Sequence, residues 1–136
     1  MSSENEGVVR RLFQAINRGE IDVLEQLIAE DVTEHEELPG LEPNKEGVIA
    51  FFRHLRAVFP DLAMTPHDVV ASGDRVAVRG TMTGTHQGEF MGIPATGNRM
   101  AVPFGDFFRL ENGQIAEHWG VTDTGVMMQQ LGVSES

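Results

Sequence analysis

The chain has 136 residues, 40% of them apolar, and its 21 acidic side chains outnumber 10 basic ones to give a net charge of −11 before histidine. This length fits one domain over residues 1–136, and the absence of cysteine excludes disulfides, thiolate nucleophiles and thiolate metal ligands. The acidic balance repels nucleic-acid phosphates and anionic lipid, and no run nears the roughly 20 apolar residues that span a bilayer. We therefore expect a cytoplasmic protein that has neither nucleic acid nor a membrane as its partner.

Helical spacing of apolar residues dominates the first part of the chain. Apolar residues recur every three or four positions over 8–16, and a stop follows at Asn17-Arg18-Gly19. A second short helix is predicted over 21–28, and a brief strand over 31–35. Asn44 is expected to cap a third helix that ends at Phe59-Pro60.

After this third helix the apolar period changes from helical to two, which is typical of strands. Asn112-Gly113 is the strongest hairpin dipeptide in the chain. A long loop with several glycines and prolines is expected over 84–98. A short closing helix is expected over 125–131. The predicted strands are 62–70, 75–85, 100–110 and 115–123.

Helices followed by an antiparallel meander describe an α+β domain. A strongly curved sheet with the helices against one face would enclose a pocket. Motifs for phosphate cradles, zincin helices and serine nucleophile elbows do not occur. The four histidines at 54, 67, 86 and 118 show no short ligand spacing, so no metal site is predicted.

Three separated segments, residues 84–97, 108–119 and 129–132, carry a family resemblance. They read GTHQGEFMGIPATG, FRLENGQIAEHW and QQLG. In this order they make the chain similar to the SnoaL-like polyketide cyclase (ester cyclase) group of the NTF2-like superfamily. The similarity extends from about Val8 to Gly132.

The resemblance implies a cone-shaped α+β barrel, in which a strongly curved antiparallel sheet wraps around N-terminal helices and leaves an apolar pocket. It also implies homodimers and intramolecular aldol condensation of a hydrophobic polyketide ester, without metal or organic cofactor. The acid/base of these cyclases is an aspartate two positions after the histidine of the Glu-His stretch. This chain has Gly120 at that position.

Strand alternation and the resemblance together indicate which ionisable residues face the pocket. His118 shares a face with Gly120, and Asp106 shares one with Phe104 and Phe108 on the neighbouring strand. If Asp106 and His118 meet, they form a general base with a partner. The alternatives are that Asp106 only anchors an arginine or a turn and that His118 is a satisfied core histidine.

Two further candidates for catalysis are weighed against structural roles. His35 would lie at the pocket mouth, with a structural role as its alternative. Asp123 precedes the closing helix, so helix capping is its default and catalysis the alternative. Glu34 and Glu36 flank His35 and are expected on a solvated face.

The expected substrate contacts combine apolar side chains with the glycine that leaves room for a ligand. They are Phe104, Phe108, Trp119, Gly120, Phe51 and Met91.

Two classes of function follow from this pattern. The first is a cofactor-independent acid–base enzyme on a hydrophobic carbonyl compound, with Asp106 as base, His118 orienting it or donating a proton, and His35 assisting. The same pocket would also suit an isomerase, dehydratase or epoxide hydrolase. The second class is a small-molecule binding protein without catalysis, which Gly120 favours.

Overall fold

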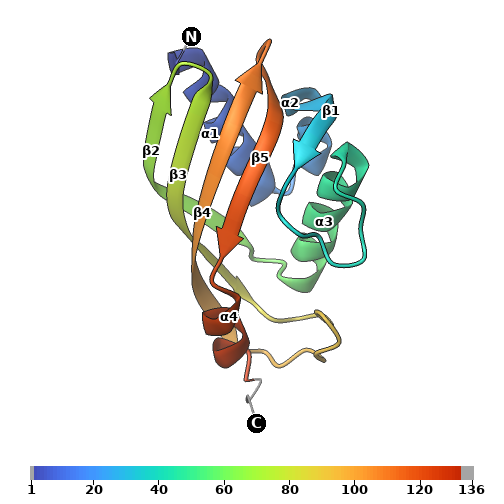
Figure 1. The fold of residues 1–136 in the computed structure, drawn as a ribbon. Coiled ribbons are helices and arrows are strands. Elements are labelled where there is room, and N and C mark those ends of the chain that lie inside the picture. The colour runs from blue at the N-terminus through green and yellow to red at the C-terminus, as the bar shows by residue number, and fades with distance from the viewer. Residues whose placement is uncertain (1, 133–136) are drawn as a thin grey trace.

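The computed structural model describes residues 2–132 and contains four α-helices, one 3₁₀ turn and five strands (Figure 1). The elements in chain order are α1 (Ser2–Arg18), η1 (Ile21–Val23), α2 (Leu24–Leu27), β1 (Ile28–Glu34), α3 (Lys45–Val58), β2 (Ala63–Ser72), β3 (Arg75–Thr85), β4 (Arg99–Glu111), β5 (Gln114–Thr122) and α4 (Thr124–Gln130).

The five strands form one curved, unclosed sheet in the order β1-β5-β4-β3-β2. Consecutive strands from β2 to β5 pair antiparallel, as the meander pattern predicts. The expectation of a wholly antiparallel sheet is wrong for one pair, because β1 runs parallel to β5. β1 is far from β5 in sequence, so no hairpin turn sets its direction. The predicted α+β class and the curved sheet are confirmed.

Local sequence signals explain where most elements begin and end. The Asn44 side chain accepts a hydrogen bond from the Gly47 N–H at 2.9 Å, which caps α3 as predicted. Asn112 and Gly113 both have positive φ, 53° and 77°, as a tight two-residue hairpin requires. The predicted second helix is shorter than expected, because Ile28 already pairs with Ile115 in β1.

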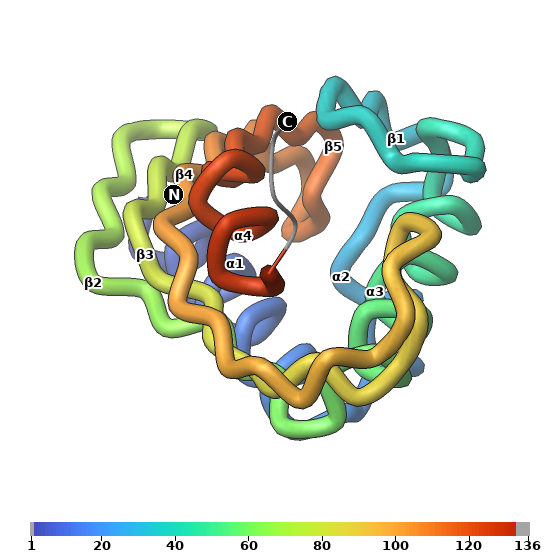
Figure 2. Tube along the Cα trace, turned by 90° about the horizontal axis from the view of Figure 1, so that it is seen from below, coloured from blue at the N-terminus to red at the C-terminus, as the bar shows by residue number. Residues whose placement is uncertain are grey.

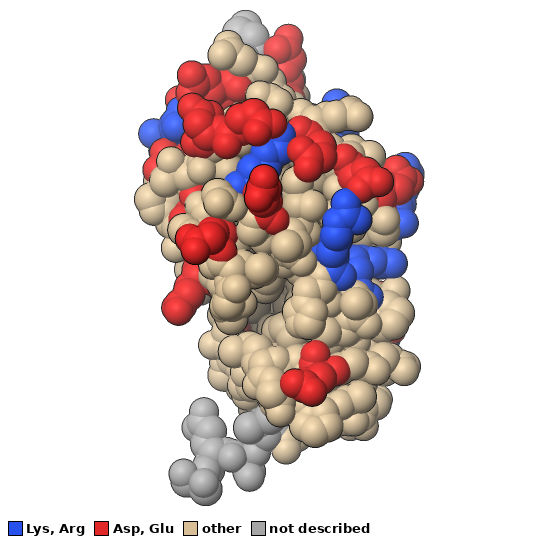
Figure 3. All heavy atoms as spheres, turned by 90° about the vertical axis from the view of Figure 1, so that its right-hand side faces the viewer, with Lys and Arg blue, Asp and Glu red and all other residues tan. Residues whose placement is uncertain are grey.

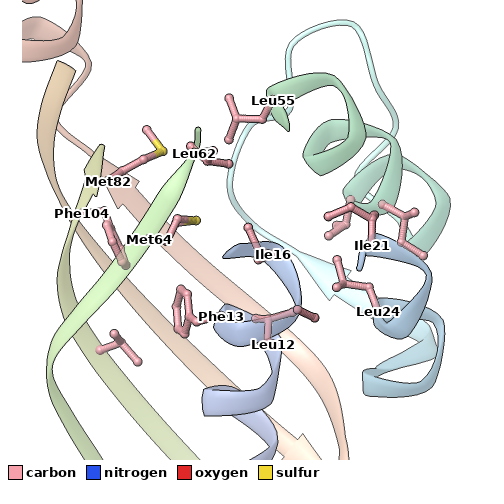
Figure 4. Packing of buried hydrophobic residues seen from close by; sticks show 14 of the residues in the cluster. Leu12, Phe13, Ile16, Ile21, Leu24, Leu55, Leu62, Met64, Met82 and Phe104 are labelled. Carbon is pink, nitrogen blue, oxygen red and sulfur yellow. The ribbon is translucent and has the colours of Figure 1, made fainter. Parts of the chain in front are cut away.

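Helix α1 packs its apolar stripe against the concave face of the sheet. Figure 4 shows Phe13 and Ile16 of α1 pointing towards Met64 of β2 and Phe104 of β4. The end of α1 is fixed by Asn17, whose amide donates to the Met64 carbonyl at 2.9 Å and accepts from the Met64 N–H at 2.6 Å. These two hydrogen bonds hold the end of α1 against the start of β2.

The loop between β3 and β4 closes over the end of the sheet near α3 (Figure 2). Its buried anchor is His86, whose Nδ1 lies 2.9 Å from the Thr96 hydroxyl and whose ring packs on Phe59. A backbone bridge between Phe90 and Ile93 forms the turn at its tip. These contacts place the tip of the loop beside α3, where His54 stacks on Phe90.

Charge is unevenly spread over the surface. Figure 3 shows acidic side chains gathered over the upper part of the face that carries β1 and α3, with mainly uncharged atoms and a hollow below them. Within residues 2–132, no helix has the length and apolar character needed to cross a membrane.

Candidate active site

A cavity of about 160 Å³ lies between the concave face of the sheet and the helices. Its walls come from α1, α3, α4, all five strands and the loop that carries Phe90. Most of these walls are apolar. The polar exceptions include three carboxylates and one imidazole: Glu34, Glu36, Asp106 and His118.

His118 is the centre of this polar group. Its Nδ1 lies 2.6 Å from Glu34 Oε2, and its Nε2 lies 3.0 Å from Asp106 Oδ1. Strand pairing explains both contacts, because Glu34 is the register partner of His118 across β1 and β5, and Asp106 is the partner of Gly120 across β4 and β5. The imidazole also packs against the ring of Phe108, with centroids 4.9 Å apart.

These contacts make His118 a positively charged group. Burial opposes its protonation, but hydrogen bonds and charge attraction from Asp106 and Glu34 outweigh burial and raise the pKa of His118 to about 10. An imidazolium donates from both nitrogens, and both donors are occupied here. Both N–H groups of His118 are therefore already bonded to carboxylates, and neither is free for a ligand.

Glu36 is the fourth member of the group, and its carboxylate has the fewest hydrogen bonds of the four. Its backbone N–H donates to Glu34 Oε2 at 3.1 Å, which turns the chain beyond β1 back towards the cavity. Within residues 2–132 no hydrogen bond reaches its carboxylate. Burial, opposed by the His118 charge and assisted by Asp106 and Glu34, raises the pKa of Glu36 to about 7.

Gly120 provides the space that the Glu36 carboxylate occupies. A Cβ at position 120 would overlap Glu36 Oε1, and it would lie 2.8 Å from Asp106 Oδ1 and 2.9 Å from His118 Cε1. A side chain at position 120 would therefore point into the centre of the polar group.

Glu36, Asp106 and His118 bring one ligand atom each within 4.8 Å of one another, which is close enough to share a cation. A metal bound there would need His118 Nε2 without its proton. The raised pKa of His118 favours the proton instead. The donor set as it stands is better suited to holding protons than to holding a metal.

Several residues predicted from the sequence lie at this cavity. Asp106 and His118 meet, with side chains that are 10% and 15% exposed. The alternative in which Asp106 anchors an arginine does not hold, since Arg79 pairs with Asp68 and Arg109 with Glu117. The predicted substrate contacts that line the cavity are Phe51, Met91, Phe104 and Phe108.

The predicted positions of His35 and Trp119 need correction. They lie on the outer face of the sheet, where their rings stack with centroids 4.9 Å apart, and His35 Nε2 lies 2.6 Å from Glu117. Trp119 also contacts Phe107 edge-on and lies under the Arg75 guanidinium. Alternation along β5 turns Trp119, the chain neighbour of His118, to the opposite face, and His35 stacks on it there.

Asp123 is exposed and caps α4, its carboxylate accepting from the Val126 N–H at 3.0 Å. This is the default role that the sequence favours. The geometry brings Asp123 no contact with the polar group around His118.

The expectation that Glu34 and Glu36 lie on a solvated face is wrong. The Glu34 side chain is 4% exposed, and both residues line the cavity. One signal pointed to Glu34: it stands two residues after the buried Val32, so both share a face of β1. Glu36 lies past the end of β1, where alternation no longer applies.

Comparisons with known proteins agree with this architecture. Residues 6–131 match a family model described as SnoaL-like polyketide cyclase. A search of curated proteins found no match. The chain is similar to the structure of TsrD from Streptomyces laurentii, at 30% identity over 97% of each chain with a TM-score of 0.88.

Two further solved structures extend this likeness. IdmH from Streptomyces antibioticus, named as a candidate polyketide cyclase, is 35% identical over 95% of this chain and 99% of its own, with a TM-score of 0.82. AclR from Streptomyces galilaeus, named as a candidate hydroxylase, is 28% identical over 99% of this chain and 100% of its own, with a TM-score of 0.88.

Proposed function

The chain belongs to the SnoaL-like polyketide cyclase family, and on that premise we propose that it is an acid–base enzyme acting on a hydrophobic carbonyl compound bound in the cavity. The proposed reaction is ring closure by intramolecular aldol condensation. The observation that carries the proposal is the carboxylate of Asp106, which lies between Phe104 and Phe108 on β4 in a mainly apolar cavity and is held by the His118 imidazolium. A buried acid–base group at the end of an apolar pocket is a common arrangement at active sites.

The proposed first step is removal of a proton from the carbon next to a carbonyl group. Asp106 accepts this proton as the C–H bond breaks, and the electron pair moves towards the carbonyl oxygen. The resulting enolate carbon attacks a second carbonyl of the same molecule and forms the new C–C bond. The second carbonyl oxygen then takes up a proton, so the substrate is isomerised without gain or loss of atoms.

His118 is proposed as a positioning residue in this reaction. Its hydrogen bond fixes the Asp106 carboxylate, and its positive charge stabilises the negative charge that develops on the substrate. Because Asp106 and His118 are already in place, they need little rearrangement while the proton is removed from carbon. Such placement of a base typically contributes on the order of 10²–10⁴-fold to a rate.

A direct test is exchange of the activated protons of 2-tetralone in D2O, followed by proton NMR. This bicyclic aromatic ketone has the apolar body and the activated C–H bond that the proposal requires. We expect the protein to speed exchange, and Asp106→Asn to reduce the protein-dependent rate by about 10²-fold or more, because the amide keeps the shape but cannot accept the proton.

The matched control is Asp68→Asn, which removes a carboxylate paired with Arg79 at the exposed surface. Its exchange rate should equal that of the unmodified protein. Binding of 2-tetralone without any exchange would support the binding-protein alternative and contradict the enzyme. Equal rates for Asp106→Asn and the unmodified protein would refute the role of Asp106.

We further propose that the protein works as a cytoplasmic homodimer formed through the outer face of the sheet. Three apolar side chains there are strongly exposed, namely Val70 at 65%, Phe107 at 42% and Val121 at 74%. Strand register aligns Val70, Phe107 and Trp119 in one row across the face. Sedimentation velocity should give twice the chain mass, and Val121→Asp should shift it to one chain mass.

A further inference from the structure

The Glu36 carboxylate lies in the cavity beside the proposed base and is not used by the steps above. It lines the cavity, and its atoms lie within 4.8 Å of those of Asp106 and His118. Within the described range 2–132, no side chain or backbone group donates a hydrogen bond to it. Each other member of the group is held by hydrogen bonds, so Glu36 is the one whose carboxyl is free to contact a ligand.

We infer that Glu36 is the proton donor of the site, supplied from the segment after β1 into the space that Gly120 leaves open. It gives its proton to the substrate oxygen on which negative charge develops, while Asp106 takes the proton from carbon. The inference rests on the proposed function for its reaction, and it adds a second catalytic residue to it.

The two carboxyl groups together balance the reaction. The C–H proton passes to Asp106 as the enolate forms, and the O–H proton of Glu36 passes to the carbonyl oxygen on which the negative charge develops. Asp106 is then protonated and Glu36 ionised. After the product leaves, solvent enters the cavity, Asp106 releases its proton to it and Glu36 takes one up, so the site is reset.

The surroundings of Glu36 are those of an acid that keeps its proton near neutral pH. The charged groups that face it are His118 from β5, Asp106 from β4 and Glu34 from β1. Burial and the two carboxylates oppose its ionisation, the His118 charge favours it, and the pKa of Glu36 is about 7. A carboxylic acid kept neutral in an apolar site can donate a hydrogen bond to a developing oxyanion.

Gly120 on β5 leaves the space that the Glu36 carboxylate enters from the segment after β1. A side chain at position 120 and the carboxylate of Glu36 compete for one space, since a Cβ on Gly120 would overlap Glu36 Oε1. The Glu36 carboxylate can therefore occupy this place only because residue 120 of β5 has no side chain. It follows that a carboxylate placed at 120 should replace one removed from 36.

The test is a reciprocal exchange of the carboxyl group between the two positions. Glu36→Ala should reduce 2-tetralone exchange by about 10²-fold. Adding Gly120→Asp to Glu36→Ala should restore the rate to within about tenfold of the unmodified protein, since the aspartate fills the vacated space. Gly120→Asp alone should be impaired, because two side chains then meet in one space. Circular dichroism checks that each variant is folded.

A matched control is Asp31→Asn, which removes an exposed carboxylate from β1, the strand that precedes Glu36. It should leave the exchange rate unchanged. Wild-type rates in Glu36→Ala, or no gain of rate on adding Gly120→Asp to it, would overturn the donor role of Glu36. The proposed function would survive that result if Asp106→Asn still loses activity.

A second readout does not depend on turnover. 3,4-Dinitrophenol is ionised near neutral pH, so it presents an aromatic ring with an oxyanion that resembles an enolate, and its absorbance reports binding. Its affinity should fall about tenfold per pH unit above about 7 in the unmodified protein and stay level in Glu36→Gln. A parallel fall in both proteins would contradict the donor role. A fall confined to the unmodified protein, with no 2-tetralone exchange, would uphold the donor and refute the proposed reaction.

Discussion

Replacing His118 with asparagine is expected to destabilise the folded protein by about 3–5 kcal/mol near neutral pH. The substitution removes the positive charge between Glu34 and Asp106, whose side chains are 4% and 10% exposed. Two buried carboxylates would then face each other and Glu36 without a counter-charge. Urea denaturation monitored by circular dichroism measures the loss.

The raised pKa of His118 determines how its stabilising effect changes with pH. The pKa of His118 is raised from 6.5 to about 10 in the folded state, so its stabilising effect is complete below 6.5 and is lost as pH rises through 10. The unmodified protein should therefore lose stability between these values. The variant should lack this dependence.

Two control variants make the result specific. His67→Asn, at an exposed histidine of β2, should change stability by less than about 0.5 kcal/mol. Adding Asp106→Asn to His118→Asn should recover part of the loss, since it removes one of the unpaired charges. Equal stability of His118→Asn and the unmodified protein at neutral pH would mean that no imidazolium holds the carboxylates.

Replacing Glu36 with glutamine should stabilise the protein, although it removes a proposed catalytic group. The pKa of Glu36 rises from 4.5 to about 7 on folding, so its ionisation opposes the folded state. The penalty is absent below 4.5 and complete once pH has risen through 7. A shift of this size corresponds to roughly 3 kcal/mol, which partial solvent exposure reduces to about 2 kcal/mol.

The measurement is a pair of urea denaturation series, one near pH 4 and one near pH 8. Glu36→Gln should match the unmodified protein in the acidic series and exceed it in the alkaline one. Asp31→Asn should show no such difference between the two series. A variant that is less stable than the unmodified protein at the higher pH would show that Glu36 is a structural residue held in its charged form. A gain of stability on losing a carboxylate is typical of groups kept for function.

Much of the fold follows from local signals in the sequence. The apolar period over residues 8–16, the Asn44 cap and the Asn112-Gly113 turn each specify an element without reference to the rest of the chain. The β4–β5 hairpin also fixes a pairing, because a two-residue turn sets the register of its strands. A bulge between Arg109 and Leu110 then shifts this register by one residue and brings Asp106 opposite Gly120. The turn alone therefore does not predict the contact of Asp106 with His118, and the expectation that both face the pocket depends on the family resemblance.

Glu34 and Glu36, the two members of the polar group that the sequence did not predict, are positioned by contacts that no local sequence pattern indicates. Glu34 reaches His118 across a parallel pairing of two strands that are 84 residues apart at that point. Glu36 lies beyond the last paired residue of β1, and its carboxylate occupies the space left by the missing side chain of Gly120. The residue types of His35 and Trp119 suit a ligand site, but alternation along β5 turns Trp119 to the outer face and His35, just after β1, stacks on it there.

The central claim is that a neutral carboxylic acid at Glu36 and a charged imidazole at His118 share one cavity near neutral pH. Carbon-13 NMR of the labelled glutamate carboxyl groups, assigned with Glu36→Gln, and nitrogen-15 NMR of the histidine rings measure both states in one titration. We predict a midpoint of about 7 for Glu36, with both nitrogens of His118 still protonated until pH approaches about 10. Ordinary midpoints, 4.5 for Glu36 and 6.5 for His118, would contradict the account.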